Sequence, residues 1–409
     1  YVRDSDFLLN TATTYPGAGG AIYSDNSGND QGSLRLKNVN FGDNYASRHG
    51  GALYSEGESN VILINGTFSE NESDAGGGGI YSLSSNLEVF NTLFQNNRSG
   101  TGGALQQFEG GLTFTNTTFT ENEALSEAFG PTGAGHAAFI SNVDQEEGGI
   151  SFVNSILWSN GTSEDAQEIL NRDTASFSHS IIENGSDGVS SISGDKLFLD
   201  ENGNEVSFEN STNLNADPQF ADAASNDFHL TRGSPALARG TFSPFEEGNI
   251  ADTVATDLDG ESRIFGLAPD LGPYEYATLS STEDEIADAS GLLGYLKPSG
   301  FAGMILLREN ATTTGGLTFE RRAEAPDDPA SELPGSVAPF TWEVISTLDG
   351  DPSYDLILET DDVPGIEDFD ALQLFVSRSG EDSWSNVEDL GGIRVAQEDR
   401  NLLAVTGLT

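Results

Sequence analysis

The chain has 409 residues, of which 66 are acidic and 17 basic; its formal net charge is -49 at pH 7, and it has no cysteine. This composition excludes disulfides, thiolate metal sites and a cysteine nucleophile. The negative charge also disfavours nucleic acid and anionic membranes as partners, because both carry phosphate.

The acidic excess is spread over the whole chain, which favours a saline (halophilic) or calcium-rich medium over one local basic partner. No apolar run approaches the ~20 residues of a membrane-spanning helix, so no membrane span is expected. A secretory leader is not visible at Tyr1, which predicts that the chain is a processed product. We therefore expect an extracellular protein.

Residues 33–44, 60–71, 86–97 and 111–122 repeat one pattern: an apolar-alternating strand, an Asn, a second short strand containing a Phe, and another Asn. The inner Asn recurs after 27, 26 and 25 residues. This period is typical of one coil of a right-handed parallel β-helix, rather than a propeller blade or a helical repeat. Two columns result: Asn38, Asn65, Asn91, Asn116 and Asn154, and Phe41, Phe68, Phe94 and Phe119.

We predict that the Phe column stacks inside the solenoid, together with an aliphatic column that includes Leu36 and Leu63. The Asn column falls where the chain bends, because Asn tolerates the left-handed conformation and its amides can bond from coil to coil. A role of these Asn residues in ligand contact is the alternative. Glycines that precede a third strand, as in Gly51-Ala-Leu-Tyr-Ser55, allow a close approach of neighbouring coils.

Further copies occur at residues 149–160 and 175–184, and His179 takes the Asn position in the second. The longer step before Asn154 predicts a protruding loop, most simply at residues 123–133. Residues 195–210 are expected to form a hairpin-like excursion. The sequence thus predicts about eight coils within residues 1–214.

Residues 215–277 carry a series of short motifs with a characteristic order. They are Asn215-Ala-Asp-Pro-Gln-Phe220, Asn226-Asp-Phe-His-Leu230, Gly233-Ser-Pro-Ala-Leu237, Thr256-Asp-Leu-Asp-Gly260 and Pro269-Asp-Leu-Gly-Pro-Tyr-Glu-Tyr276. This series resembles the C-terminal end of bacterial surface β-helix proteins of the choice-of-anchor Q type, whose coils are similar to polymorphic outer-membrane-protein repeats. The resemblance spans about residues 17–276 and implies a surface location. Since an open solenoid end exposes unpaired strands, we expect this segment to cap the last coil.

Residues 278–409 contain six alternating strands separated by Pro, Gly and Asp turns, which predicts an antiparallel β-sandwich. The strands fall at 303–308, 316–321, 340–345, 354–359, 372–377 and 384–388. Their order resembles the sandwich modules that precede sorting domains in surface proteins exported by the type IX route.

Parallel β-helices also occur in polysaccharide lyases and hydrolases, so an enzyme is the competing interpretation. A hydrolase needs two carboxylates ~5–10 Å apart, but the outward column Arg35, Ile62, Glu88 and Thr113 is neither acidic nor basic. The turn Asp257-Leu-Asp259-Gly260 places alternating carboxylates before a glycine, as a Ca²⁺ loop would; an ordinary Asp-Gly turn is the alternative.

The sequence therefore predicts a non-catalytic extracellular surface protein, an adhesin or a structural subunit of a surface assembly or filament. The alternative is a β-helix carbohydrate-active enzyme, a polysaccharide lyase or hydrolase. No cofactor is expected to be required, although Ca²⁺ is possible at Asp257 and Asp259. The expected partners are other copies of the chain, other surface proteins or surface glycans.

Overall fold

The computed structural model describes residues 1–276 except 27–31, 58–59, 126–134, 142–148, 162–166, 173, 192–194, 201, 232–233, 238, 246–255, 261–262 and 264–267, and beyond them the strands within residues 279–408. The chain forms two compact units, Tyr1–Leu230 with Pro235–Glu275, and Thr231–Ser234 with Tyr276–Thr409. The described residues are almost entirely β-structure, and their only helical elements are short 3-10 turns. The predicted all-β fold class is confirmed.

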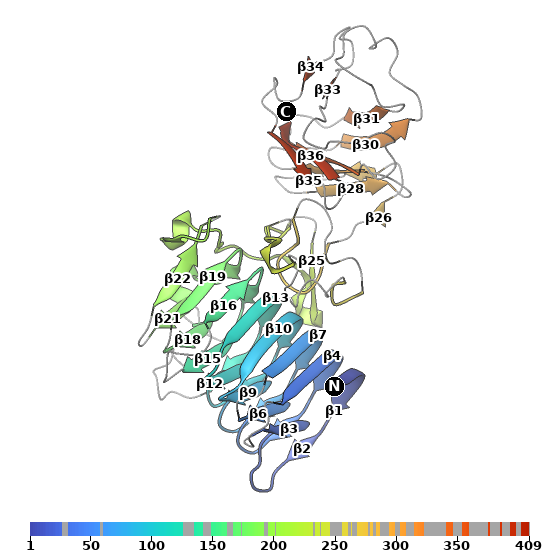
Figure 1. Ribbon diagram of the computed structural model, residues 1–409. Coiled ribbons are helices and arrows are strands. Elements are labelled where there is room, and N and C mark those ends of the chain that lie inside the picture. The colour runs from blue at the N-terminus through green and yellow to red at the C-terminus, as the bar shows by residue number, and fades with distance from the viewer. Residues whose placement is uncertain are drawn as a thin grey trace. The chain divides into compact units, whose positions relative to one another are not determined.

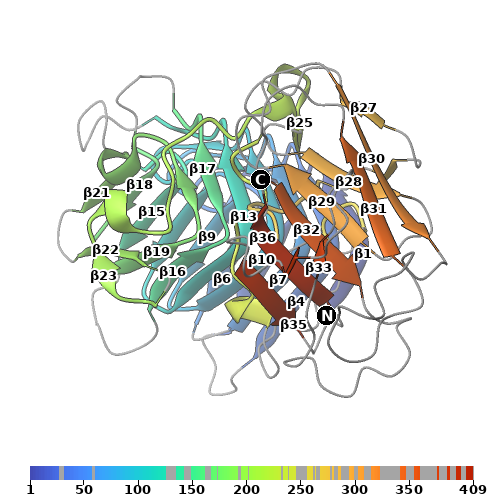
Figure 2. The same ribbon diagram turned by 90° about the horizontal axis from the view of Figure 1, so that it is seen from above.

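The first unit is a parallel β-helix in which each coil contributes to up to three sheets (Figure 1). The largest sheet contains β1 (Val2–Leu8), β4 (Ser33–Gly42), β7 (Asn60–Ser69), β10 (Asn86–Gln95), β13 (Leu112–Thr120), β16 (Ile150–Val153), β19 (Ala175–Ser178) and β22 (Lys196–Leu199). Eight coils follow one another in this order, as the repeat predicts. Figure 2 shows the strands from β4 to β19 stacked side by side.

Two further sheets complete the coils. One contains β2 (Thr11–Ala12), β5 (Tyr45–Ala46), β8 (Glu72–Ser73), β11 (Arg98–Ser99) and β14 (Glu123–Ala124). The other contains β3 (Ile22–Asp25), β6 (Leu53–Glu56), β9 (Ile80–Leu83), β12 (Leu105–Phe108), β15 (Ala138–Ser141), β18 (Ile169–Asn171) and β21 (Val189–Ser191). The loop predicted at residues 123–133 begins later, because Glu123 and Ala124 belong to β14; residues 126–133 lie outside the described residues.

Aromatic rings occupy two neighbouring columns of the core. Phe7, Phe41, Phe68, Phe94 and Phe119 stack with centroid distances of 4.9, 4.6, 4.9 and 4.7 Å along the series. A second series, Phe114, Phe152, Phe177 and Phe198, continues at 4.9, 5.1 and 5.7 Å. The two series meet in the fifth coil, where the rings of Phe114 and Phe119 lie edge to face at 5.0 Å. The interior therefore keeps a continuous aromatic packing although the column changes.

The bend inside the largest sheet is made by residues with positive φ. Their φ values are 52° at Asn38, 54° at Asn65, 45° at Asn91, 52° at Asn116, 53° at Asn154 and 45° at His179. These positions have the left-handed conformation that Asn tolerates better than most residues. In the coils of Asn154 and His179 the strand divides there, and β17 (Ile156–Trp158) and β20 (Ile181–Ile182) follow the bend.

Glycine occupies the turn before the third strand in the first four coils, at Gly20, Gly51, Gly78 and Gly103, whereas His136 takes this position in the fifth coil. A Cβ on Gly51 would lie 2.1 Å from the carbonyl oxygen of Gly78, and a Cβ on Gly78 would lie 2.3 Å from that of Gly103. These distances are far below van der Waals contact with backbone atoms that cannot move independently. The neighbouring coil therefore excludes a side chain at Gly51 and Gly78, as the sequence predicts.

The last coil ends in a hairpin of β22 and β23 (Glu205–Val206), followed by the 3-10 turn η3 (Phe208–Asn210). The ring of Phe208 packs edge to face on Phe198 at 5.0 Å and covers the end of the aromatic column. Residues 215–230 and 235–275, called here the return segment, contain β24 (Phe220–Asp222), β25 (Asp227–Leu230) and η5 (Ser243–Phe245).

The return segment lies along the side of the solenoid and contacts earlier coils. Phe245 packs against an outward apolar cluster of Ile62, Ile64 and Phe90, and the amide of Asn96 bonds to Asn226. Contacts of residues 215–277, predicted as a cap, thus lie on the side of the solenoid, while Phe208 packs at the end of the last coil; the cap stays a prediction.

The second unit consists of mostly antiparallel strands. A six-stranded sheet has the order β26-β28-β29-β32-β36-β35, a three-stranded sheet the order β27-β30-β31, and β33 pairs with β34. The strands are β26 (Leu279–Ser280), β27 (Asp284–Ile286), β28 (Gly294–Pro298), β29 (Gly303–Leu307), β30 (Gly315–Arg322), β31 (Thr341–Ser346), β32 (Tyr354–Glu359), β33 (Phe375–Val376), β34 (Ser385–Asn386), β35 (Ile393–Gln397) and β36 (Leu402–Leu408). All pairs are antiparallel except β26 with β28.

Candidate functional site

A continuous amide ladder runs along the second Asn column. Its members are Asn10, Asn44, Asn71, Asn97, Asn122 and Asn160. From Asn44 onward, each side-chain Nδ2 donates to the Oδ1 of the next Asn, at 2.8–2.9 Å, and to the carbonyl of a residue in the preceding coil. Asn160 donates instead to Glu168 Oε2 at 2.5 Å. The ladder therefore ties neighbouring coils together through amides that are buried from Asn44 onward.

Glu168 is completely buried at the end of this ladder. Burial raises the pKa of Glu168 well above its usual range, and the hydrogen bond from Asn160 opposes that shift. A neutral carboxyl can still accept the amide hydrogen bond through its oxygens. Glu168 thus replaces the Asn that a regular coil would supply, and its burial makes it a structural group.

The inner Asn column has a second role that the sequence does not reveal. The amide of Asn91 donates to Asn65 Oδ1 at 3.2 Å, but also to the carbonyl of Thr256 at 2.7 Å. Asn154 exchanges two hydrogen bonds with the backbone of Thr241, at 2.9 and 2.8 Å. The ladder predicted at these positions is therefore interrupted, because several amides hold the return segment.

Asn116 binds the return segment beside a buried ion pair. Its amide donates to the carbonyls of Asp270 and Gly272, and the guanidinium of Arg263 donates to the same two carbonyls at 2.8 and 3.0 Å. Arg263 also pairs with Glu275, and both side chains are 1% exposed. Burial raises the pKa of Glu275 well above its usual range, although the charge of Arg263 opposes the shift. These contacts fix the segment against the solenoid.

The two residues predicted as calcium ligands occupy different environments. Asp257 is buried, and its carboxylate oxygens accept backbone N–H bonds from Asp259 at 3.0 Å and from Glu275 at 2.9 Å. Asp259 is half-exposed and contacts a histidine. Among the described residues, no three His, Asp or Glu side chains are grouped to hold a metal ion. The calcium prediction continues to rest on the sequence pattern alone.

His229 joins β25 to this turn through two carboxylates. Its Nδ1 lies 2.5 Å from Asp227 Oδ1, its Nε2 lies 2.6 Å from Asp259 Oδ2, and its ring packs on Tyr274 at 4.1 Å. Burial lowers the pKa of His229, but the two carboxylates outweigh burial and raise it above its ordinary value. Both ring nitrogens are occupied, so this arrangement acts as an electrostatic clip and leaves no free nitrogen for proton transfer.

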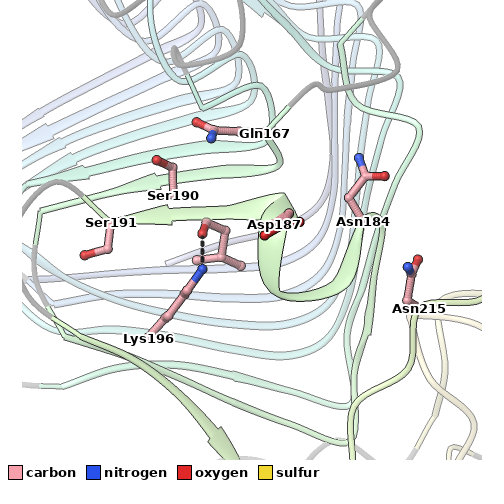
Figure 3. A pocket seen from close by; sticks show the side chains of 8 residues that line it. Gln167, Asn184, Asp187, Ser190, Ser191, Lys196 and Asn215 are labelled. Atoms are coloured by element: carbon pink, nitrogen blue, oxygen red, sulfur yellow. Dashed lines mark hydrogen bonds between the residues drawn. The ribbon is translucent and has the colours of Figure 1, made fainter. Parts of the chain in front are cut away.

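A hollow of about 640 Å³ lies beside the last coils (Figure 3). It is lined by Gln167, Asn184, Asp187, Val189, Ser190, Ser191, Lys196 and Asn215. These residues come from the segment before β18, from the 3-10 turn η2 (Gly185–Gly188), from β21 and β22, and from the start of the return segment. All of the lining residues except Val189 are polar, which distinguishes the hollow from the usual apolar pocket.

Lys196 supplies the positive charge of the hollow. Its ammonium donates to the carbonyl of Ser186 at 2.6 Å and to that of Val189 at 3.0 Å, and Figure 3 shows the second bond. Both acceptors belong to or follow η2, so the ammonium lies where carbonyl dipoles gather. Sequence reasoning missed this hollow because the repeat degrades after Asn184, and single polar residues outside a repeat carry no periodic signal.

Comparison with known proteins gives a match within the solenoid and a similarity to one bacterial protein. The profile of the Chlamydia polymorphic membrane protein repeat matches residues 65–83, which run from the bend in β7 through the glycine turn to β9. A "Probable autotransporter YfaL" of Escherichia coli (strain K12) is 28% identical over 157 residues, or 37% of this chain. The matched region is 12% of that relative. No solved structure gave a significant match.

Proposed function

We propose that the chain is an extracellular bacterial surface protein of the adhesin type, or a structural subunit of a surface assembly. The observation that carries this proposal is the repeat match. Residues 65–83 include the bend Asn65, the core Phe68 and the ladder Asn71, which are the features that build each coil. The chain therefore resembles a membrane-protein repeat in the elements that determine its architecture. The similarity to a probable autotransporter supports the same surface location.

A solenoid suits this role because its surface is long, regular and held by contacts between adjacent coils. The ladder and the aromatic columns cross every coil junction from β1 to β13. Exposed loops and edges then remain available for contact with another copy, another surface protein or a glycan.

The proposed role is non-catalytic. Glu88 is the one carboxylate in the outward column Arg35, Ile62, Glu88 and Thr113, and burial raises its pKa as in a general acid. Its neighbours in the adjacent coils are Ile62 and Thr113. Glycoside hydrolysis by the common mechanisms uses a second carboxylate within about 10 Å, and these neighbours do not supply one.

Two measurements test the proposal. Antibodies against the solenoid should label intact cells of a producing strain, and labelling only after permeabilisation would refute a surface location. Purified protein should release neither reducing ends nor unsaturated uronate from neutral or acidic polysaccharides, with or without Ca²⁺. Turnover that is abolished by Glu88→Gln or Asp259→Asn would establish the enzyme alternative instead.

A further inference from the structure

The hollow beside β21 contains polar side chains that the fold itself does not use. Within the described residues, the side chains of Gln167, Asp187, Ser190 and Asn215 form no hydrogen bond with the protein, while the lining gathers them around one space. Polar groups of a folded chain are usually paired with protein or with water. The hollow is therefore lined by two amides, one carboxylate and one hydroxyl that are available to a ligand. Together these groups offer both hydrogen-bond donors and acceptors.

Lys196 adds a cationic donor that forms no ion pair within the described residues. Its ammonium bonds only to the carbonyls of Ser186 and Val189 within the described residues, so one of its three N–H groups remains for a ligand. Lysine is scarce in a chain with 66 acidic residues. Asp187 lines the same hollow and keeps its local charge balanced.

We propose that this hollow is a binding site for a neutral saccharide. A sugar presents many hydroxyl groups, each of which both donates and accepts, and the amides, the serine hydroxyls and Asp187 match that demand. Lys196 would bond to a hydroxyl or ring oxygen. The volume of about 640 Å³ falls within the roughly 300–1,000 Å³ of small-molecule sites. This inference rests on the proposed surface function and names the class of ligand.

The charge of the chain selects a neutral saccharide over an acidic one. A net charge of -49 repels polyanionic glycans, and Asp187 stands among the lining residues. An apolar ligand is disfavoured, because Val189 is the only aliphatic residue of the lining. The lining also has no aromatic ring on which a sugar could stack, so we expect weak binding, with a Kd on the order of 1 mM.

Saturation-transfer NMR on the full chain suits this affinity. The probes are the neutral oligosaccharides cellohexaose, maltohexaose, xylohexaose and chitohexaose, with hexagalacturonate as the acidic counterpart. Ser190→Ala removes one hydroxyl from β21 and should weaken binding roughly two- to tenfold, the effect of one hydrogen bond. Ser151→Ala is the matched control, because Ser151 is also partly exposed on a strand of the solenoid but lies outside the lining. Lys196→Met should weaken binding at least as much.

Binding of a neutral probe that Ser190→Ala weakens and Ser151→Ala leaves unchanged would support the site. No binding of any neutral probe, equal effects of the two serine variants, or tighter binding of hexagalacturonate would overturn it. Ser190→Ala keeps the test decisive if Lys196→Met fails to fold, since Lys196 also holds η2. Surface labelling of cells with no saccharide binding would refute only the site, whereas the absence of labelling would refute the proposed function.

Discussion

Phe68→Ala tests the register of the solenoid at a fully enclosed ring. Phe68 is fully buried, and its ring stacks on Phe41 at 4.6 Å and on Phe94 at 4.9 Å, so its removal breaks two ring contacts at once. An aromatic side chain buries about 150–250 Å², which at ~25 cal/mol per Å² is about 4–6 kcal/mol. The alanine keeps a methyl group and the coils can partly relax, so we expect a loss of about 3–5 kcal/mol.

The assay is thermal unfolding of the purified chain, followed by circular dichroism. For a unit of this size, each kcal/mol of lost stability lowers the Tm by about 2–4 °C. The Tm of the transition assigned to unfolding of the solenoid should therefore fall by on the order of 10 °C. Leu9→Ala is the control, because Leu9 is 75% exposed and its truncation should cost less than about 0.5 kcal/mol. An unchanged Tm for Phe68→Ala would mean that the Phe column faces solvent and that the strand register is wrong by one residue.

Three further predictions concern charge, the ladder and pH. The Tm should rise between about 10 mM and 1 M NaCl as the Debye length falls from ~30 to ~3 Å; a flat profile would contradict self-repulsion of the -49 charge. Asn97→Ala should cost about 2–4 kcal/mol in chemical denaturation, because it orphans buried groups in adjacent coils, whereas the exposed Asn202→Ala should be near neutral. The protonated His229 clip is fully present below the unfolded pKa of about 6.5 and is lost as pH rises through its raised folded pKa. The amount by which His229→Gln lowers the Tm relative to the unchanged chain should therefore shrink from about pH 6 to pH 9. A difference in Tm that is independent of pH would refute a stabilising role of protonated His229.

The coils were predictable because each one repeats the same physical constraints at the same spacing. Phe68 and Asn65 have counterparts in the coils on both sides, so their roles are visible in the sequence. The ladder through Asn97 had the same signal, since it is the last residue of an aligned stretch. The repeated residues thus identify both the core and the places where the chain bends.

The path of the return segment was not predictable in the same way. Asn91 bonds to the backbone carbonyl of Thr256, 165 residues away, and any residue type presents a carbonyl. The hollow likewise combines Gln167, which lies between two copies of the repeat, and Lys196, which follows the point where the repeat degrades. Glu168 accepts the last hydrogen bond of the ladder from a segment outside the repeat pattern. No recurring residue type at this position could therefore predict its role.

The change of aromatic column in the fifth coil divides the solenoid into two kinds of interchangeable module. Coils before it place their ring at the position of Phe94, and coils after it place theirs at the position of Phe152. A gene duplication or deletion that adds or removes one coil within either group would leave every ring against a ring of the same column. The coil that contains Phe114 and Phe119 carries both rings and has no equivalent, so an exchange there would leave a hole or superpose two side chains. Growth and shrinkage of the solenoid should therefore occur on either side of this coil, while the coil itself persists as a fixed junction.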